Sequence, residues 1–187
     1  MEHAAAVHVH ENVPNGRWGL WLFIISESFL FAAFLSGRFF MLGFYRPEEL
    51  NQLLGLGITS VLLLSSLTAY RAETSIAYGD RPRFLRNTLV TVLLAGLFLV
   101  GVGIEWAEAF RFFPPSTRFG TVFFSLTGLH ALHVLSGVVL LVFVYRHGRA
   151  GRYGPSDYWP VEGVVKYWHF VDVAWVFIYP TLYLVAP

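Results

Sequence analysis

Five long apolar blocks, separated by short polar segments, dominate the pattern of the chain. They cover residues 18–42, 50–70, 88–110, 119–145 and 161–185. A helix needs about 20 apolar residues to cross the roughly 30 Å hydrocarbon core of a bilayer. Barrel strands would instead alternate apolar and polar residues over about ten positions. The pattern therefore predicts an all-α, polytopic membrane protein with five transmembrane helices in a single domain, residues 1–187.

Short connections separate the blocks. Proline marks two of them, at Arg46-Pro47 and at Phe113-Pro114-Pro115, because the residue before proline is disfavoured in a helix. Helices joined by short loops pack as antiparallel neighbours. We therefore expect an antiparallel bundle.

Composition narrows the function classes. Hydrophobic residues make up 56% of the chain and charged residues 13%, about half the charged share of a soluble domain. The net charge of +1 gives no sign of a nucleic-acid partner. The absence of cysteine excludes disulfides, thiolate metal sites, iron–sulfur clusters and covalently attached haem. The polar N-terminus does not resemble a cleavable signal peptide, so we expect the first block to be a membrane helix.

Arginine and lysine are distributed unevenly between the two ends of the predicted bundle. One end holds nine: Arg17, Arg71, Arg81, Arg83, Arg86, Arg146, Arg149, Arg152 and Lys166. The other end holds four: Arg38, Arg46, Arg111 and Arg118. Cytoplasmic loops carry the excess of such residues. The N-terminus is therefore predicted to be cytoplasmic and the C-terminus outside.

Six ionisable residues inside the blocks are the candidate functional residues. They are Glu27, Glu105, His130, His133, His169 and Asp172. Each costs at least about 2.5–3.5 kcal/mol to insert in hydrocarbon, so each needs an explanation. They are either proton-linked groups or structural groups that form hydrogen bonds between helices. Glu27, near the middle of its block, is open to both interpretations.

Glu105 and Glu108 are three residues apart, so they share a helix face near the outer end of the third block. We expect them to face water there, with Trp106 as an anchor at the membrane interface.

The histidine pair of the fourth block allows two interpretations. His130 and His133 lie on one helix face and could hold a metal or haem, with His169 as a third ligand. Haem-binding bundles usually take axial ligands from facing helices, so we favour hydrogen bonds to a buried acid such as Glu105 or Asp172. The nearby Gly128 and Gly137 suggest close helix contact.

The fifth block carries two polar pairs. His169 and Asp172 are expected to pair with polar groups on the third and fourth helices, and Glu162 and Lys166 form an i, i+4 pair. The tail histidines His3, His8 and His10 do not by themselves predict a metal site.

Three strings in the blocks resemble one family. Residues 20–31 read LWLFIISESFLF, residues 127–137 read TGLHALHVLSG, and residues 167–175 read YWHFVDVAW. The first is similar to a pattern of tryptophan, Ser-Glu and phenylalanines. The others resemble Thr-Gly-x-His-x-x-His-Val-x-x-Gly and Tyr-Trp-His-Phe-Val-Asp-x-x-Trp. In this order and over nearly the whole chain, they resemble subunit III of the haem–copper oxidases (cytochrome c oxidase subunit III) in a short five-helix form.

The resemblance implies a non-catalytic subunit of a proton-pumping terminal oxidase of aerobic respiration, which transfers electrons from cytochrome c to oxygen. Its partners would be catalytic subunit I, subunit II and membrane lipids, with no nucleic acid. The haems and copper would lie in the partner subunits, and this chain would hold no active site, metal or redox cofactor. It would bind phospholipid, stabilise the catalytic subunit and support proton uptake, in the plasma membrane of a bacterium. The six polar residues occupy the family's intramembrane polar positions, and Glu27 stands where the family keeps a buried acid.

Two departures from the family accompany the resemblance. The long form has seven helices, with a lipid-holding cleft between the first two and the rest, and this chain matches only the last five. Any such cleft would need another subunit. Val102 stands where the family often has a glutamine, which puts a polar contact near Glu105 in doubt.

Other functions stay open at this point. A quinol oxidase subunit and an accessory protein of nitric oxide reductase are close variants. A small proton-coupled transporter using Glu27 and Asp172, or a haem protein using His130 or His133, would belong to other classes. Neither internal repeats nor interrupted helices, which are typical of transporters, are visible in the sequence.

Overall fold

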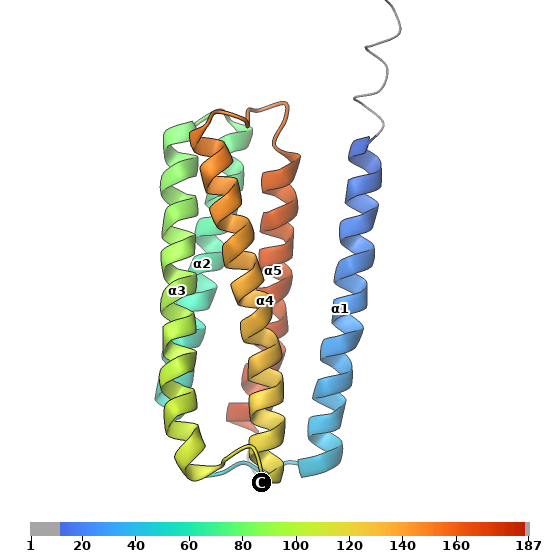
Figure 1. The fold of residues 1–187 in the computed structure, drawn as a ribbon, viewed down its shortest axis with the longest axis vertical. Helices are drawn as coiled ribbons and strands as arrows, with labels where there is room; N and C mark the ends of the chain where they lie inside the picture. The colour runs from blue at the N-terminus through green and yellow to red at the C-terminus, as the bar shows by residue number, and fades with distance from the viewer. Residues whose placement is uncertain (1–11, 186–187) are drawn as a thin grey trace, which may run out of the picture.

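The computed structural model describes residues 12–185. Within this range the chain is all-α. The helices are α1 (Asn12–Leu42), α2 (Gln52–Ala77), α3 (Arg81–Phe112), α4 (Arg118–Arg149) and α5 (Trp159–Tyr179), followed by the π-helix η1 (Pro180–Leu184). Loops at one end join α1 to α2 and α3 to α4, and loops at the other end join α2 to α3 and α4 to α5 (Figure 1). The tail histidines His3, His8 and His10 lie outside the described residues.

The helices confirm the prediction of a membrane protein. α1, α2, α3 and α4 are long and apolar enough to cross a bilayer. α5 has 21 residues that include Glu162, Lys166 and Asp172, and it does not meet the same criterion. Passage of α5 through the membrane stays a prediction.

The helices extend past the apolar blocks. The segment between residues 70 and 88, predicted as a polar connection, is helical except for residues 78–80. Asp80 caps α3 by accepting a hydrogen bond from the Arg83 amide at 3.0 Å, and Gly79 supplies the positive φ of +79° that the turn needs. Hydropathy marks where apolar side chains end, whereas backbone hydrogen bonds and caps decide where a helix ends. At the C-terminus, α5 ends at Tyr179 because Pro180 has no amide hydrogen to donate.

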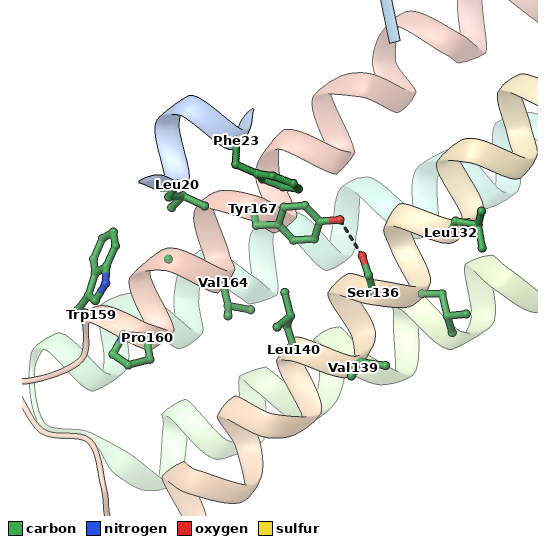
Figure 2. A pocket seen from close by; sticks show the side chains of 12 residues that line it. Leu20, Phe23, Leu132, Ser136, Val139, Leu140, Trp159, Pro160, Val164 and Tyr167 are labelled. Carbon is green, nitrogen blue, oxygen red and sulfur yellow. Dashed lines mark hydrogen bonds between the residues drawn. The ribbon is translucent and has the colours of Figure 1, made fainter. Parts of the chain in front are cut away.

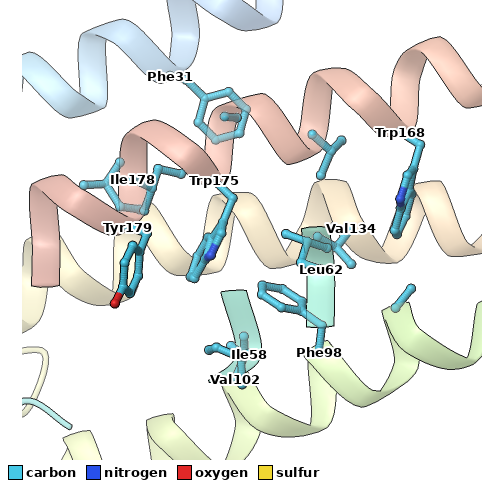
Figure 3. Close-up of a cluster of buried hydrophobic side chains, with 14 of the residues drawn as sticks. Phe31, Ile58, Leu62, Phe98, Val102, Val134, Trp168, Trp175, Ile178 and Tyr179 are labelled. Atoms are coloured by element: carbon cyan, nitrogen blue, oxygen red, sulfur yellow. The ribbon is translucent and has the colours of Figure 1, made fainter. Parts of the chain in front are cut away.

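Aromatic side chains fill the space between α2, α3, α4 and α5. Trp168 and Trp175 of α5 are fully buried, and Trp175 lies beside Phe98 of α3, with 5.1 Å between the ring centroids (Figure 3). A Cβ atom added at Gly137 of α4 would lie 2.8 Å from the Trp168 ring. The predicted close helix contact at this glycine is therefore confirmed.

α1 packs differently from the other helices. It lies apart from α2 and α3 and contacts α4 and α5 (Figure 1). Only 6% of the residues in its most apolar stretch are buried, compared with 33% in the corresponding stretches of α2, α3 and α4. Most of its apolar surface is therefore available to lipid or to another protein.

Candidate functional site

Glu27 of α1 and His133 of α4 form a polar contact between the two helices. Oε2 of Glu27 lies 3.1 Å from Nε2 of His133. The other ring nitrogen, Nδ1, lies 2.8 Å from the Leu129 carbonyl oxygen. The Phe31 ring covers the imidazole, with 4.9 Å between the ring centroids. The Glu27 side chain is 20% exposed and the His133 side chain 13%, so water has little access to the contact.

This geometry fixes the number of protons that the pair holds. A carbonyl oxygen only accepts hydrogen bonds, so Nδ1 of His133 must carry a hydrogen. The contact between Nε2 and Glu27 then requires one more proton, which lies either on the carboxyl or on the ring. Both arrangements have zero net charge. The pair is a one-proton site with no net charge in the apolar region.

His130 has a different environment, although it is only three residues from His133. It is fully buried, and its ring lies 4.7 Å from that of Trp175 and 5.7 Å from that of Phe98. Among residues 12–185, neither of its nitrogens has a hydrogen-bond partner. The expected bonds from this histidine pair to Glu105 or Asp172 are not observed, because His133 faces α1 and His130 faces an aromatic layer.

A second polar group joins α2 to α5. Nδ1 of His169 lies 2.7 Å from Oγ of Ser66 and 4.0 Å from Oδ2 of Asp172, which is 3% exposed. The sequence placed the partners of His169 and Asp172 on the third and fourth helices. The structure instead places Ser66 of α2 beside them, because α5 also packs against α2.

Sequence reasoning missed the hydroxyl groups of α2. Ser65 accepts a hydrogen bond from Nε1 of Trp168 at 3.1 Å, and Thr59 accepts one from Nε1 of Trp175 at 2.9 Å. Two features of the sequence indicate these hydrogen bonds. A buried tryptophan usually finds a partner for its N–H, and hydroxyl residues recur along the second block. These bonds align α5 with α2 and so position Asp172.

The two glutamates of α3 do not share one environment. Glu108 is exposed as expected, but Glu105 is 3% exposed, so the prediction that both face water is wrong for Glu105. Residues three apart differ by about 60° around a helix, and the edge of the bundle passes between them. Trp106 turns inward, and its Nε1 donates to Oγ1 of Thr127 at 3.0 Å.

Within the described part of the chain, no group of three or more histidine, aspartate or glutamate side chains could hold a metal ion. The geometry of His130 and His133 gives no support to a metal shared between them, because one ring faces aromatic side chains and the other faces Glu27.

An apolar groove of about 820 Å³ lies between α1, α4 and α5. Its lining residues are Leu20, Phe23, Leu132, Leu135, Ser136, Val139, Leu140, Trp159, Pro160, Gly163, Val164 and Tyr167. Tyr167 points its hydroxyl toward Ser136, 2.7 Å from Oγ (Figure 2). Glu27 lies one helical turn beyond Phe23, so the one-proton site adjoins the groove.

Charged side chains surround Trp159 at one end of the groove. The Arg17 guanidinium lies 5.1 Å from the ring centroid of Trp159, and Nζ of Lys166 lies 5.8 Å from it. Glu162 pairs with both cations, at 3.2 Å from Arg17. The predicted Glu162–Lys166 pair is confirmed. This end of the groove therefore has two cations and one carboxylate around an aromatic ring.

Comparison with known proteins gives one consistent family. A sequence model for "Cytochrome c oxidase subunit III" matches residues 2–186. The chain is 36% identical over 177 residues to cytochrome c oxidase subunit 3 of Artemia franciscana, covering 89% of this chain and 68% of that protein. It is 36% identical over 179 residues to the Papio hamadryas protein, with the same coverage. A probable cytochrome c oxidase subunit 3 of Nocardia farcinica is 32% identical over 160 residues, covering 83% and 79%.

The match extends over nearly the whole chain and includes the helices that carry Glu27, His133, His169 and Asp172. The resemblance seen in the sequence is therefore confirmed. The chain belongs to the cytochrome c oxidase subunit III family and is a membrane subunit of a multi-subunit respiratory oxidase.

Proposed function

We propose that this chain is the non-catalytic subunit III of a proton-pumping haem–copper oxidase that receives electrons from cytochrome c. The family match over residues 2–186 carries this proposal. The chain binds beside catalytic subunit I and near subunit II, which hold the haems and copper. It spans the plasma membrane of a bacterium five times as an antiparallel bundle, with its N-terminus in the cytoplasm. The distribution of nine and four basic residues supports that orientation.

The one-proton site at Glu27 and His133 supports a role in proton uptake. It lies on α1, the helix with the most exposed apolar surface, and so can adjoin the catalytic subunit. In this proposal, the pair contributes to proton delivery near that interface and to stable turnover. Glu27→Gln in the intact oxidase tests this role. We expect slower proton uptake or a shorter turnover lifetime, with Glu108→Gln as the exposed control. Unchanged pumping, lifetime and assembly would make Glu27 a packing group.

The groove between α1, α4 and α5 supports phospholipid binding. Its lining is almost wholly apolar, which fits an acyl chain, and Arg17 and Lys166 at one end can attract an anionic headgroup. A bound lipid would fill the space between α1 and the bundle and stabilise the contact with the catalytic subunit.

Purification of the tagged chain in mild detergent tests the assembly. We expect subunits I and II of a cytochrome c oxidase to copurify and to be identified by mass spectrometry. Quinol oxidase or nitric oxide reductase subunits would change the proposed electron donor or reaction. A chain that purifies alone from membranes containing the oxidase would contradict the proposal and favour a transporter using Glu27 and Asp172.

A further inference from the structure

Arg38 is a fully buried arginine near the end of α1. Its Nε donates to the Thr181 carbonyl oxygen at 3.0 Å and its Nη2 to that of Tyr45 at 3.0 Å, while Nη1 donates to that of Gly43. These carbonyl groups belong to the loop after α1 and to η1, which are far apart in sequence. A guanidinium has five N–H donors in a rigid fork and can therefore bridge several acceptors. Arg38 ties the end of α1 to the C-terminal π-helix.

Arg46 makes a second connection to the same segment. Its Nη1 donates to the carbonyl oxygen of Tyr183 at 2.7 Å. The side-chain amide of Gln52, in the first turn of α2, lies beside the same guanidinium. Carbonyl groups in the last turn of a helix lack partners within the helix. The two arginines supply donors to η1 from the side of α1.

The position of η1 places Tyr183 inside the bundle. Tyr183 is fully buried, and its ring stacks on that of Tyr179 at 5.0 Å. It fits because α2 has a glycine at this point: a Cβ atom added at Gly55 would lie 2.7 Å from the Tyr183 ring. Its hydroxyl and the carboxyl of Glu105 are both buried polar groups. Among the described residues, neither the hydroxyl nor the carboxyl oxygens form a hydrogen bond.

We propose that η1 is a plug that closes this end of the bundle over Glu105, and that Arg38 and Arg46 are the positioning residues that hold it. Glu105 lies within two turns of the end of α3, and Glu108, one turn closer to that end, is exposed. Glu105 lies on the inner side of the bundle edge, so its protection from water entering at this end depends on what covers it there. In this proposal the Tyr183 side chain is that cover. Arg46 holds the Tyr183 carbonyl group, and Arg38 holds that of Thr181 in the same π-helix.

Carboxyl labelling tests the plug directly. The probe is a water-soluble carbodiimide with glycine ethyl ester, applied to the full chain in its purified membrane complex, with modification measured by mass spectrometry. In the wild-type protein we expect label on Glu108 and little on Glu105. Arg46→Ala should raise the rate at Glu105 by roughly tenfold, which corresponds to about 1.4 kcal/mol and lies within reach of one hydrogen bond to a charged group. Arg118 is an exposed arginine at the same end, so Arg118→Ala is the matched control and should leave the labelling rate of Glu105 unchanged.

Two variants of Tyr183 keep the test decisive if Arg46→Ala, or the corresponding Arg38→Ala, does not fold. Tyr183→Ala removes the cover and leaves both arginines, so it should expose Glu105. Tyr183→Phe keeps the ring and should leave Glu105 protected. Equal labelling of Glu105 and Glu108 in the wild-type protein would overturn the proposal. Protection of Glu105 in Tyr183→Ala would remove the role of Tyr183, and protection in both Arg46→Ala and Arg38→Ala would remove that of the arginines.

Discussion

Nε2 of His133 lies 3.1 Å from a carboxyl oxygen of Glu27, and the other nitrogen of the same ring faces a backbone carbonyl. This arrangement needs a proton between two side chains whose residues are 106 positions apart in the sequence. It also gives α1 a polar contact with a bundle that it otherwise touches mainly through apolar side chains.

Replacing Glu27 by alanine should destabilise the protein more than replacing it by glutamine. Glu27→Ala leaves Nε2 of His133 unpaired, which we expect to cost about 1–3 kcal/mol. Glu27→Gln can still donate to that nitrogen and should cost under about 1 kcal/mol. Thermal unfolding in detergent, followed by circular dichroism, measures both. Equal stability of the two variants would show that the contact does not hold α1.

Gly137 is needed for the approach of α4 to α5. Gly137→Ala places a methyl group 2.8 Å from the Trp168 ring, and overpacking of this kind typically costs about 1–3 kcal/mol. Gly103 of α3 is a matched control, since a Cβ atom there has no neighbour within 4 Å. Gly103→Ala should be neutral or stabilising by up to about 1 kcal/mol. The prediction fails if both alanines shift the unfolding midpoint in the same direction.

The lipid proposal can be tested by filling the groove. Val139 of α4 lines it and is 47% exposed. Val139→Trp should occupy the space for an acyl chain and reduce copurifying phospholipid, measured by native mass spectrometry. Val173→Trp puts the same ring on an exposed position of α5 outside the groove lining and serves as the control. Equal lipid content in the two variants would contradict the assignment.

Burial of Tyr153, in the loop between α4 and α5, predicts that this loop loses stability at alkaline pH. Burial raises the pKa of Tyr153 above its ordinary value, and its ring packs edge-on against Phe84. The folded state thus favours the neutral phenol. This stabilisation is complete below a pH of about 10, the pKa of an unfolded tyrosine, and is lost as the pH rises through the higher folded pKa. The thermal unfolding midpoint in detergent should fall in that range, and Tyr153→Phe should remove this contribution to the fall.

The sequence predicted where polar residues enter the apolar blocks, because each ionisable group there carries an insertion cost. It did not predict their partners. Glu27 pairs with α4 and His169 with α2 because of how the helices adjoin one another, which periodicity within one helix does not encode. Arg38 shows the same limit. It was counted with the cations of the outer side, but its guanidinium is fully buried among carbonyl groups of two distant segments.

The reduced-minus-oxidised spectrum of the tagged chain, recorded before and after the partner subunits are stripped away, tests the central claim most directly. As a subunit that shares an oxidase but holds no redox centre, the chain should copurify with a haem spectrum that disappears when the large polytopic partner is removed. A haem spectrum that stays with the isolated chain would contradict this account and would direct attention to His130 and His133 as ligands.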